Sequence, residues 1–121
     1  MQEKILSFRE RTSHHFAVID ILGEVKKPHG FHQLDQEFGK FLTSEKYHIA
    51  LNFSQCIYMD TDGIGSLVRL RQQIQGKGQI VILEPSAQAR HIIMLSGLDK
   101  ILDIYESEKT FVQELNHLSK P

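Results

Sequence analysis

Apolar and polar residues alternate in two segments near the beginning of the chain, residues 4–9 and 15–22. This alternation is typical of strands that turn one face toward a core and the other toward solvent. Because the two segments are close in sequence, we expect them to form an antiparallel pair. The glycines and the proline of residues 23–30 break the pattern and predict a loop.

In the rest of the chain, segments with helical spacing alternate with apolar runs that are typical of strands. The helical segments are residues 31–44, residues 62–75, the stretch from Ser86 to Gly97 and the stretch that Ser107 opens. The strand-like runs are residues 47–53, 79–83 and 100–105. Such an order implies parallel crossovers, and therefore an α/β fold with a mixed, mostly parallel sheet of about five strands packed against about four helices. We expect a single domain over residues 1–121, with its core at about residues 4–118.

Composition limits the partners without indicating a function. The chain has 121 residues, 40% hydrophobic and 24% charged, and a formal net charge of −1, which gives no reason to expect nucleic acid as a partner. No apolar run approaches the roughly 18 residues of a membrane span and no signal peptide is visible, so we expect a cytoplasmic protein without direct membrane insertion. The single cysteine, Cys56, lies among apolar residues, which predicts a small buried side chain.

A short polar stretch, YMDTDGIGSL at residues 58–67, interrupts the apolar pattern where the second helix begins. Asp60 precedes the helix and is predicted to be its N-cap, accepting hydrogen bonds from amides of the first turn. Asp62 lies in that turn, where the helix dipole favours negative charge. Helix capping alone therefore explains both acids, and a binding role is an equal alternative at this point.

A helical wheel indicates which side chains of this turn a partner could reach. It places Asp62 and Ser66 on the polar face and Thr61 toward the edge of the apolar stripe. Gly63 and Gly65 put no bulky side chain beside Asp62, so a partner could approach closely. The turn is therefore a candidate binding surface.

Other chemistry fits the stretch less well. Its glycines match only part of the dinucleotide-binding fingerprint, because Val68 stands at the third glycine position. An aspartyl phosphoacceptor needs further carboxylates to hold a metal ion, and only Glu24 follows the second strand. The histidines include one H-x-x-H pair, His29 and His32, but no further ligand lies near it in sequence. We therefore predict no metal, no cofactor and no enzymatic activity.

Three longer segments resemble one family. LNFSQCIYMDTDGIGSL, GQIVILEPSAQARHIIMLSGLDKIL and FAVIDILGEV are together similar to the STAS domain, in particular to the bacterial anti-sigma-factor antagonists. The resemblance covers most of residues 5–115. Its most specific parts are the Met-Asp-x-x-Gly-hydrophobic-Gly turn and the segment LSGLDKIL. It implies the order of strands and helices predicted above, and a non-catalytic module of signal transduction and transcription regulation that binds proteins.

The resemblance also assigns roles within the turn, and here the chain departs from the family. The family turn usually reads Asp-Ser-Ser-Gly, and a partner serine kinase, which is also the anti-sigma factor, phosphorylates the second serine. Asp60 and Gly63 match, Thr61 stands at the first serine and Asp62 at the second. The phosphorylation site is thus substituted, unless Thr61 has become the acceptor. The packing predicted for Thr61 and the acids beside it favour a poor acceptor.

Lys26 is a second departure, since many antagonists carry an acidic residue after the Gly-Glu turn. The expected partner-binding residues are Lys26, Asp60, Thr61, Asp62, Gly63, Gly65 and Ser66. The leading interpretation is a module that binds an anti-sigma factor/serine kinase or a related signalling protein, with Asp62 either imitating phosphoserine or serving as a plain substitution. The alternative is a STAS subunit of a larger assembly, such as a lipid-transport complex or a stressosome-like scaffold, without phospho-switching. The sequence leaves open whether the chain forms a homodimer.

Overall fold

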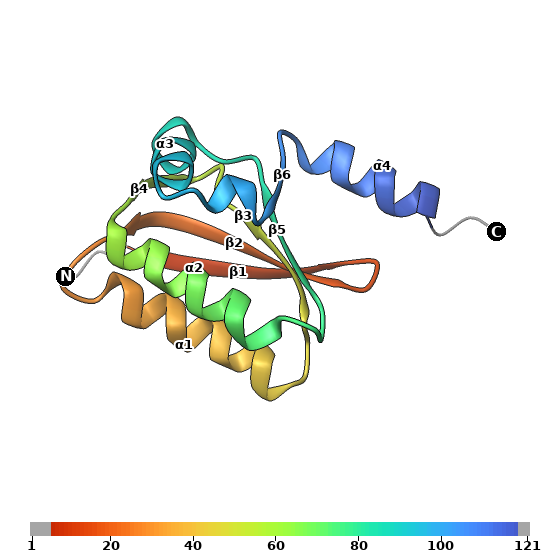
Figure 1. The fold of residues 1–121 in the computed structure, drawn as a ribbon, viewed down its shortest axis with the longest axis horizontal. Helices are drawn as coiled ribbons and strands as arrows, with labels where there is room; N and C mark the ends of the chain where they lie inside the picture. Colours follow the sequence, from red (N-terminus) through yellow and green to blue (C-terminus); the bar gives the residue numbers. More distant parts are fainter. Residues whose placement is uncertain (1–5, 119–121) are drawn as a thin grey trace.

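The structure is a computed structural model that describes residues 6–118. Residues 1–5 and 119–121 lie outside the described part. The predicted start of the first strand, at residue 4, is among them. Within the described part, strands and helices follow the order predicted, except that a further strand, β4, lies between β3 and α2 (Figure 1). The elements are β1 (Leu6–Ser13), β2 (Phe16–Val25), α1 (Gly30–Thr43), β3 (His48–Asn52), β4 (Cys56–Met59), α2 (Thr61–Ile74), β5 (Gln79–Leu83), α3 (Ala87–Leu95), β6 (Asp103–Tyr105) and α4 (Glu108–Leu118). A short 3-10 helix, Leu98–Lys100, precedes β6.

These strands form one mixed sheet in the order β1-β2-β3-β5-β6, with β4 paired to β2 beside this path. Only β1 and β2 are antiparallel, and the other pairs are parallel. The predicted α/β class and mostly parallel sheet are therefore confirmed. The sequence prediction missed β4, and it placed residues 23–25 in a loop although they belong to β2. These residues pair with β4, because β2 continues beyond the part of it that pairs with β3.

Both faces of the sheet are covered by helices. On one face α1, α2 and α3 pack over the large core, which contains Ile19 and Leu51. On the other face, Phe111 and Leu115 of α4 pack with Val18 and neighbouring strand residues. In Figure 1, α1 and α2 run side by side along the strands, while α4 lies beyond the end of β6. The one-sided alternation predicted for residues 15–22 is thus wrong, because β2 is buried on both faces.

The predicted ends of the helices agree with the structure. Ser86 Oγ accepts from the Ala89 amide at 3.3 Å, and Ser107 Oγ accepts from the amide of the first turn of α4 at 3.1 Å. Gly97 follows α3 in the left-handed conformation, with φ of +80°, which glycine adopts without strain. The turn between β1 and β2 contains His15, which had been predicted to begin the second strand.

Candidate functional site

Asp60 joins two segments that are distant in sequence. Its Oδ1 accepts from the Gly63 amide at 3.0 Å, which confirms the predicted N-cap of α2. Its Oδ2 accepts from the Lys27 amide at 3.0 Å, and its own amide donates to the Val25 carbonyl at 2.9 Å. One carboxylate thus ties the β2–α1 loop to the start of α2, so the loop and the turn form one surface.

Asp62 lies in the first turn of α2 with its side chain 39% exposed. Its Oδ2 lies 3.8 Å from the Nζ atom of Lys27, whose side chain is 78% exposed. An exposed ion pair of this length contributes about 0–1 kcal/mol, so it does not lock either side chain. Asp62 therefore offers a negative charge at the surface, with a movable cation beside it.

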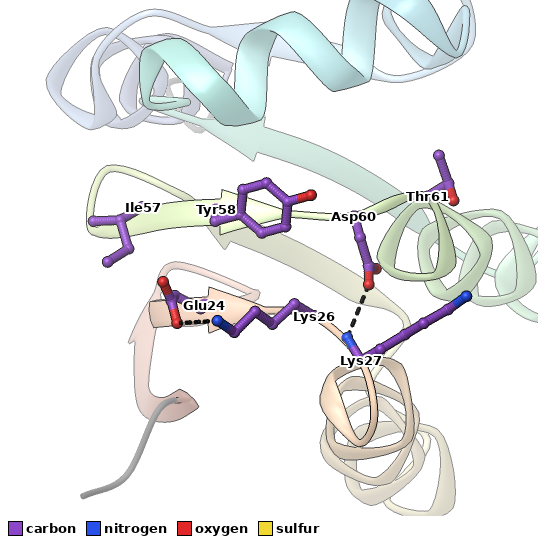
Figure 2. A pocket seen from close by; sticks show the side chains of 7 residues that line it. All are labelled: Glu24, Lys26, Lys27, Ile57, Tyr58, Asp60 and Thr61. Atoms are coloured by element: carbon purple, nitrogen blue, oxygen red, sulfur yellow. Dashed lines mark hydrogen bonds and ion pairs between the residues drawn. The ribbon is translucent and has the colours of Figure 1, made fainter.

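Thr61 is exposed and lines a hollow of about 620 Å³ beside Asp60 (Figure 2). The prediction that Thr61 leans toward the packed side of the helix is wrong. Thr61 is the first residue of α2, and at this end of the helix its side chain meets the hollow rather than the core. Access alone therefore gives no reason for Thr61 to be a poor phosphoacceptor.

Two of the predicted contact residues, Gly63 and Ser66, serve mainly to pack the helix. Gly63 is buried against Met59, and Ser66 is fully buried instead of lying on the polar face. The Ser66 hydroxyl donates to the Phe31 carbonyl of α1 at 3.2 Å. Gly65 is only partly exposed. The reachable side chains of the turn are therefore those of Asp60, Thr61 and Asp62.

The hollow also brings in residues that the sequence prediction did not select. Its other lining residues are Glu24, Lys26, Lys27, Ile57 and Tyr58. Ile57 is 68% exposed and Tyr58 is 42% exposed, which is unusual for large side chains at the middle of a strand. The signal available in the sequence was their position directly before the polar turn. Lys26, which had been predicted to take part, lies there with Nζ 3.2 Å from the Glu24 carboxylate.

The site combines polar and apolar side chains on one surface. Cys56 lies in β4 but is fully buried, and burial raises the pKa of its thiol to about 11. Within residues 6–118 no three His, Cys, Asp or Glu side chains lie close enough together to hold a metal ion. No helix in that range is long and apolar enough to cross a membrane.

The fold and the turn define a class of α/β domain in which the N-terminus of a helix is presented beside a charged hollow. Residues 3–111 match the family model of the STAS domain, so the chain belongs to the STAS domain family. Over 73 residues the chain is 29% identical to the anti-sigma F factor antagonist of Paenibacillus polymyxa. That match covers 60% of this chain and 62% of the relative, so it spans less than two thirds of the relative's length.

Solved structures agree in fold. An anti-sigma factor antagonist from Mycobacterium paratuberculosis gives a TM-score of 0.77 at 18% identity, covering 92% of this chain and 94% of that chain. The phosphorylated form of the Bacillus cell fate determinant SpoIIAA gives a TM-score of 0.67 at 21% identity, covering 88% of this chain and 98% of that chain. At these identities the similarity establishes the fold, and function has to be argued from the site.

Proposed function

We propose that this chain is a non-catalytic regulatory module of the anti-sigma-factor antagonist type. It binds an anti-sigma factor with serine-kinase character, or a related signalling protein, through the surface made by the β2–α1 loop, β4 and the start of α2. The names of the relatives support the class of partner. The exposed pair Ile57 and Tyr58 beside the polar turn carries the assignment of the surface.

The physical reason is that this surface has the composition of an interface. Apolar and aromatic side chains supply most of the energy of protein association when a partner covers them, and surrounding polar groups orient the partner. Here Ile57 and Tyr58 line the same hollow as charges of both signs, which lie on Glu24, Asp60, Lys26 and Lys27. Tyr58 is the residue that we expect to contribute most.

In this function Asp62 is a constitutive contact. A phosphoserine carries about −1.5 to −2 charges, whereas aspartate carries one, on a shorter side chain. Lys27 lies near enough to offset part of that charge, so the turn remains able to bind without modification. Thr61 is accessible, but the acids on either side of it would repel an incoming phosphate, and we expect it to accept phosphate poorly.

A second candidate, a STAS subunit of a larger assembly, is favoured by one separate observation. A hollow on α3 is lined by Ala87, Arg90, His91, Met94 and Leu95, and the last two side chains are 54% and 73% exposed. A module that contacts one partner does not require this second apolar surface. A scaffold subunit with two neighbours would use it.

Affinity capture with matched variants separates the two functions. We expect the wild type and Leu95→Ser to retain the same signalling protein from a lysate of the source cells, and Tyr58→Ser to lose it. Identification of that protein by mass spectrometry as a kinase-type anti-sigma factor would support the first function. Loss on Leu95→Ser with retention on Tyr58→Ser would instead favour the assembly subunit and would contradict the proposed surface.

A further inference from the structure

A second hollow, of about 1030 Å³, lies between β1 and α1 and contains a buried carboxylate. Glu37 of α1 is only 6% exposed, although it lines this hollow. Its Oε1 accepts from the Nζ atom of Lys40 at 3.0 Å. Its Oε2 is buried and has no hydrogen-bond partner among the described residues. A buried acceptor without a donor is costly, so this oxygen requires an explanation.

Close packing of the core does not explain why a glutamate is buried at this position. Glu37 lies on the face of α1 that also buries Leu34, Phe38 and Phe41, where an apolar side chain would fit. Charged residues are almost never fully buried unless they are paired. Its cationic partner, Lys40, bonds only Oε1, which leaves Oε2 unpaired among the described residues.

Glu10 of β1 supplies a second carboxyl group at the same place. Lys40 Nζ also donates to Glu10 Oε2, at 2.6 Å, so the ammonium group bridges the two acids. Burial, followed by a side-chain hydrogen bond with Glu10, raises the pKa of Glu37. The Lys40 side chain is 60% exposed and flexible, so it can leave without breaking the core. Two carboxyl groups thus share one removable cation.

We propose that Glu10 and Glu37 form a binding site for the guanidinium group of an arginine side chain on a protein partner, and that Lys40 occupies this site in the free protein. A guanidinium group presents N–H donors in a planar fork and can bond both carboxylates, including the unpaired Oε2. A single lysine ammonium reaches only one oxygen of Glu37. Binding of arginine therefore completes the hydrogen bonds that the free protein leaves unmade.

The choice of a protein as the source of this arginine rests on the proposed function. The second hollow and the hollow at the turn share three lining residues, Glu24, Lys26 and Lys27. A partner that covers the turn therefore lies next to the entrance of the β1–α1 hollow. A metal ion is a weaker candidate, because no group of three ligands forms in the described residues.

The test needs no partner. The side-chain carboxyl groups of glutamate are labelled with 13C, and the protein is titrated with ethylguanidinium chloride, with tetramethylammonium chloride as a cation that has no N–H donors. We expect saturable shifts of the Glu10 and Glu37 signals with ethylguanidinium only. In Lys40→Gln the dissociation constant of ethylguanidinium should fall by about fivefold. This is the change expected if Lys40 occupies the site for about four-fifths of the time in the wild type, so that only about one-fifth of the sites are free to bind. Lys109→Gln, which removes an exposed charge on α4, should leave it unchanged.

In Glu37→Gln the saturable shift of Glu10 should disappear, and Glu10→Gln gives the converse measurement if the first variant does not fold. Equal shifts with both cations would overturn the proposal and show that the two acids share only a proton and Lys40. An unchanged dissociation constant in Lys40→Gln would overturn it too. Neither result bears on the turn, so failure here leaves the proposed function standing, and failure of affinity capture leaves this site standing.

Discussion

Gly63→Ala tests whether the turn is fixed by close packing beneath it. A Cβ atom at this position would lie 2.7 Å from Met59 Cγ and 2.9 Å from Val25 Cγ1. Both neighbours are fully buried, and the β-branched Val25 has little rotamer freedom, so neither moves aside easily. Overpacking costs about 1–3 kcal/mol, whereas replacing a helical glycine by alanine gains about 0.5–1 kcal/mol. We expect the free energy of unfolding to fall by about 1–2 kcal/mol.

Gly65→Ala is the matched control, because it makes the same change in the same turn of α2. The nearest atom to its Cβ would be Arg69 Nη1 at 3.2 Å, at the far end of a flexible exposed side chain. This variant should therefore be as stable as the wild type, or more stable by up to about 1 kcal/mol. The measurement is equilibrium unfolding in urea. If Gly63→Ala proved as stable as Gly65→Ala, the packing argument would be refuted.

Two further predictions concern other parts of the molecule. Arg11 donates hydrogen bonds to both Asp20 and Glu108. Its guanidinium group lowers the pKa of Glu108. Burial alone would raise the pKa of Asp20, but Arg11 and Arg9 together outweigh burial and lower it. The network therefore stabilises the fold above about pH 4, and this stability is lost as pH falls through the lowered pKa values. Arg11→Gln should cost about 1–2 kcal/mol at pH 7 in urea unfolding, and progressively less as the pH is lowered below about 4. A difference that does not change with pH would contradict this. Cys56 should not react with a disulfide reagent at pH 8 until the protein unfolds, because its thiol is fully buried and burial raises its pKa to about 11. Rapid labelling of the folded protein would contradict this and would show an opening of β4.

The fold class was predictable because helical periodicity and apolar runs are local signals that survive in a single sequence. The fourth strand was not predictable in this way. Cys56–Met59 has only four residues, and although all four are hydrophobic its two central side chains are exposed, so neither its length nor an alternation of apolar and polar residues indicates a strand. It is a strand because β2 extends beyond the residues that pair with β3 and leaves backbone groups for β4 to pair with.

The candidate site, too, was predictable only where it depends on residues that are neighbours in the sequence. The role of Asp60 as N-cap depends on residues next to it, and it was predicted correctly. The position of Ser66 depends on α1, whose Phe31 carbonyl covers the hydroxyl, and a helical wheel contains no neighbouring helix. Thr61 was placed wrongly because a wheel does not describe the exposed end of a helix. Glu37 was missed because it occupies a place in an apolar stripe.

The most direct test of the central claim is the affinity of the captured partner for the wild type and for Asp62→Asn, measured by titration calorimetry. Asparagine keeps the shape of the side chain and removes only the charge at the start of α2. If Asp62 is a constitutive contact, the variant should bind about fivefold to tenfold more weakly, since a charge-assisted hydrogen bond is lost. Asp62→Ser should weaken binding in the same direction. Tighter binding by both variants would show that Asp62 imitates phosphoserine, and unchanged binding would show that the partner does not contact the turn; either result would contradict the account.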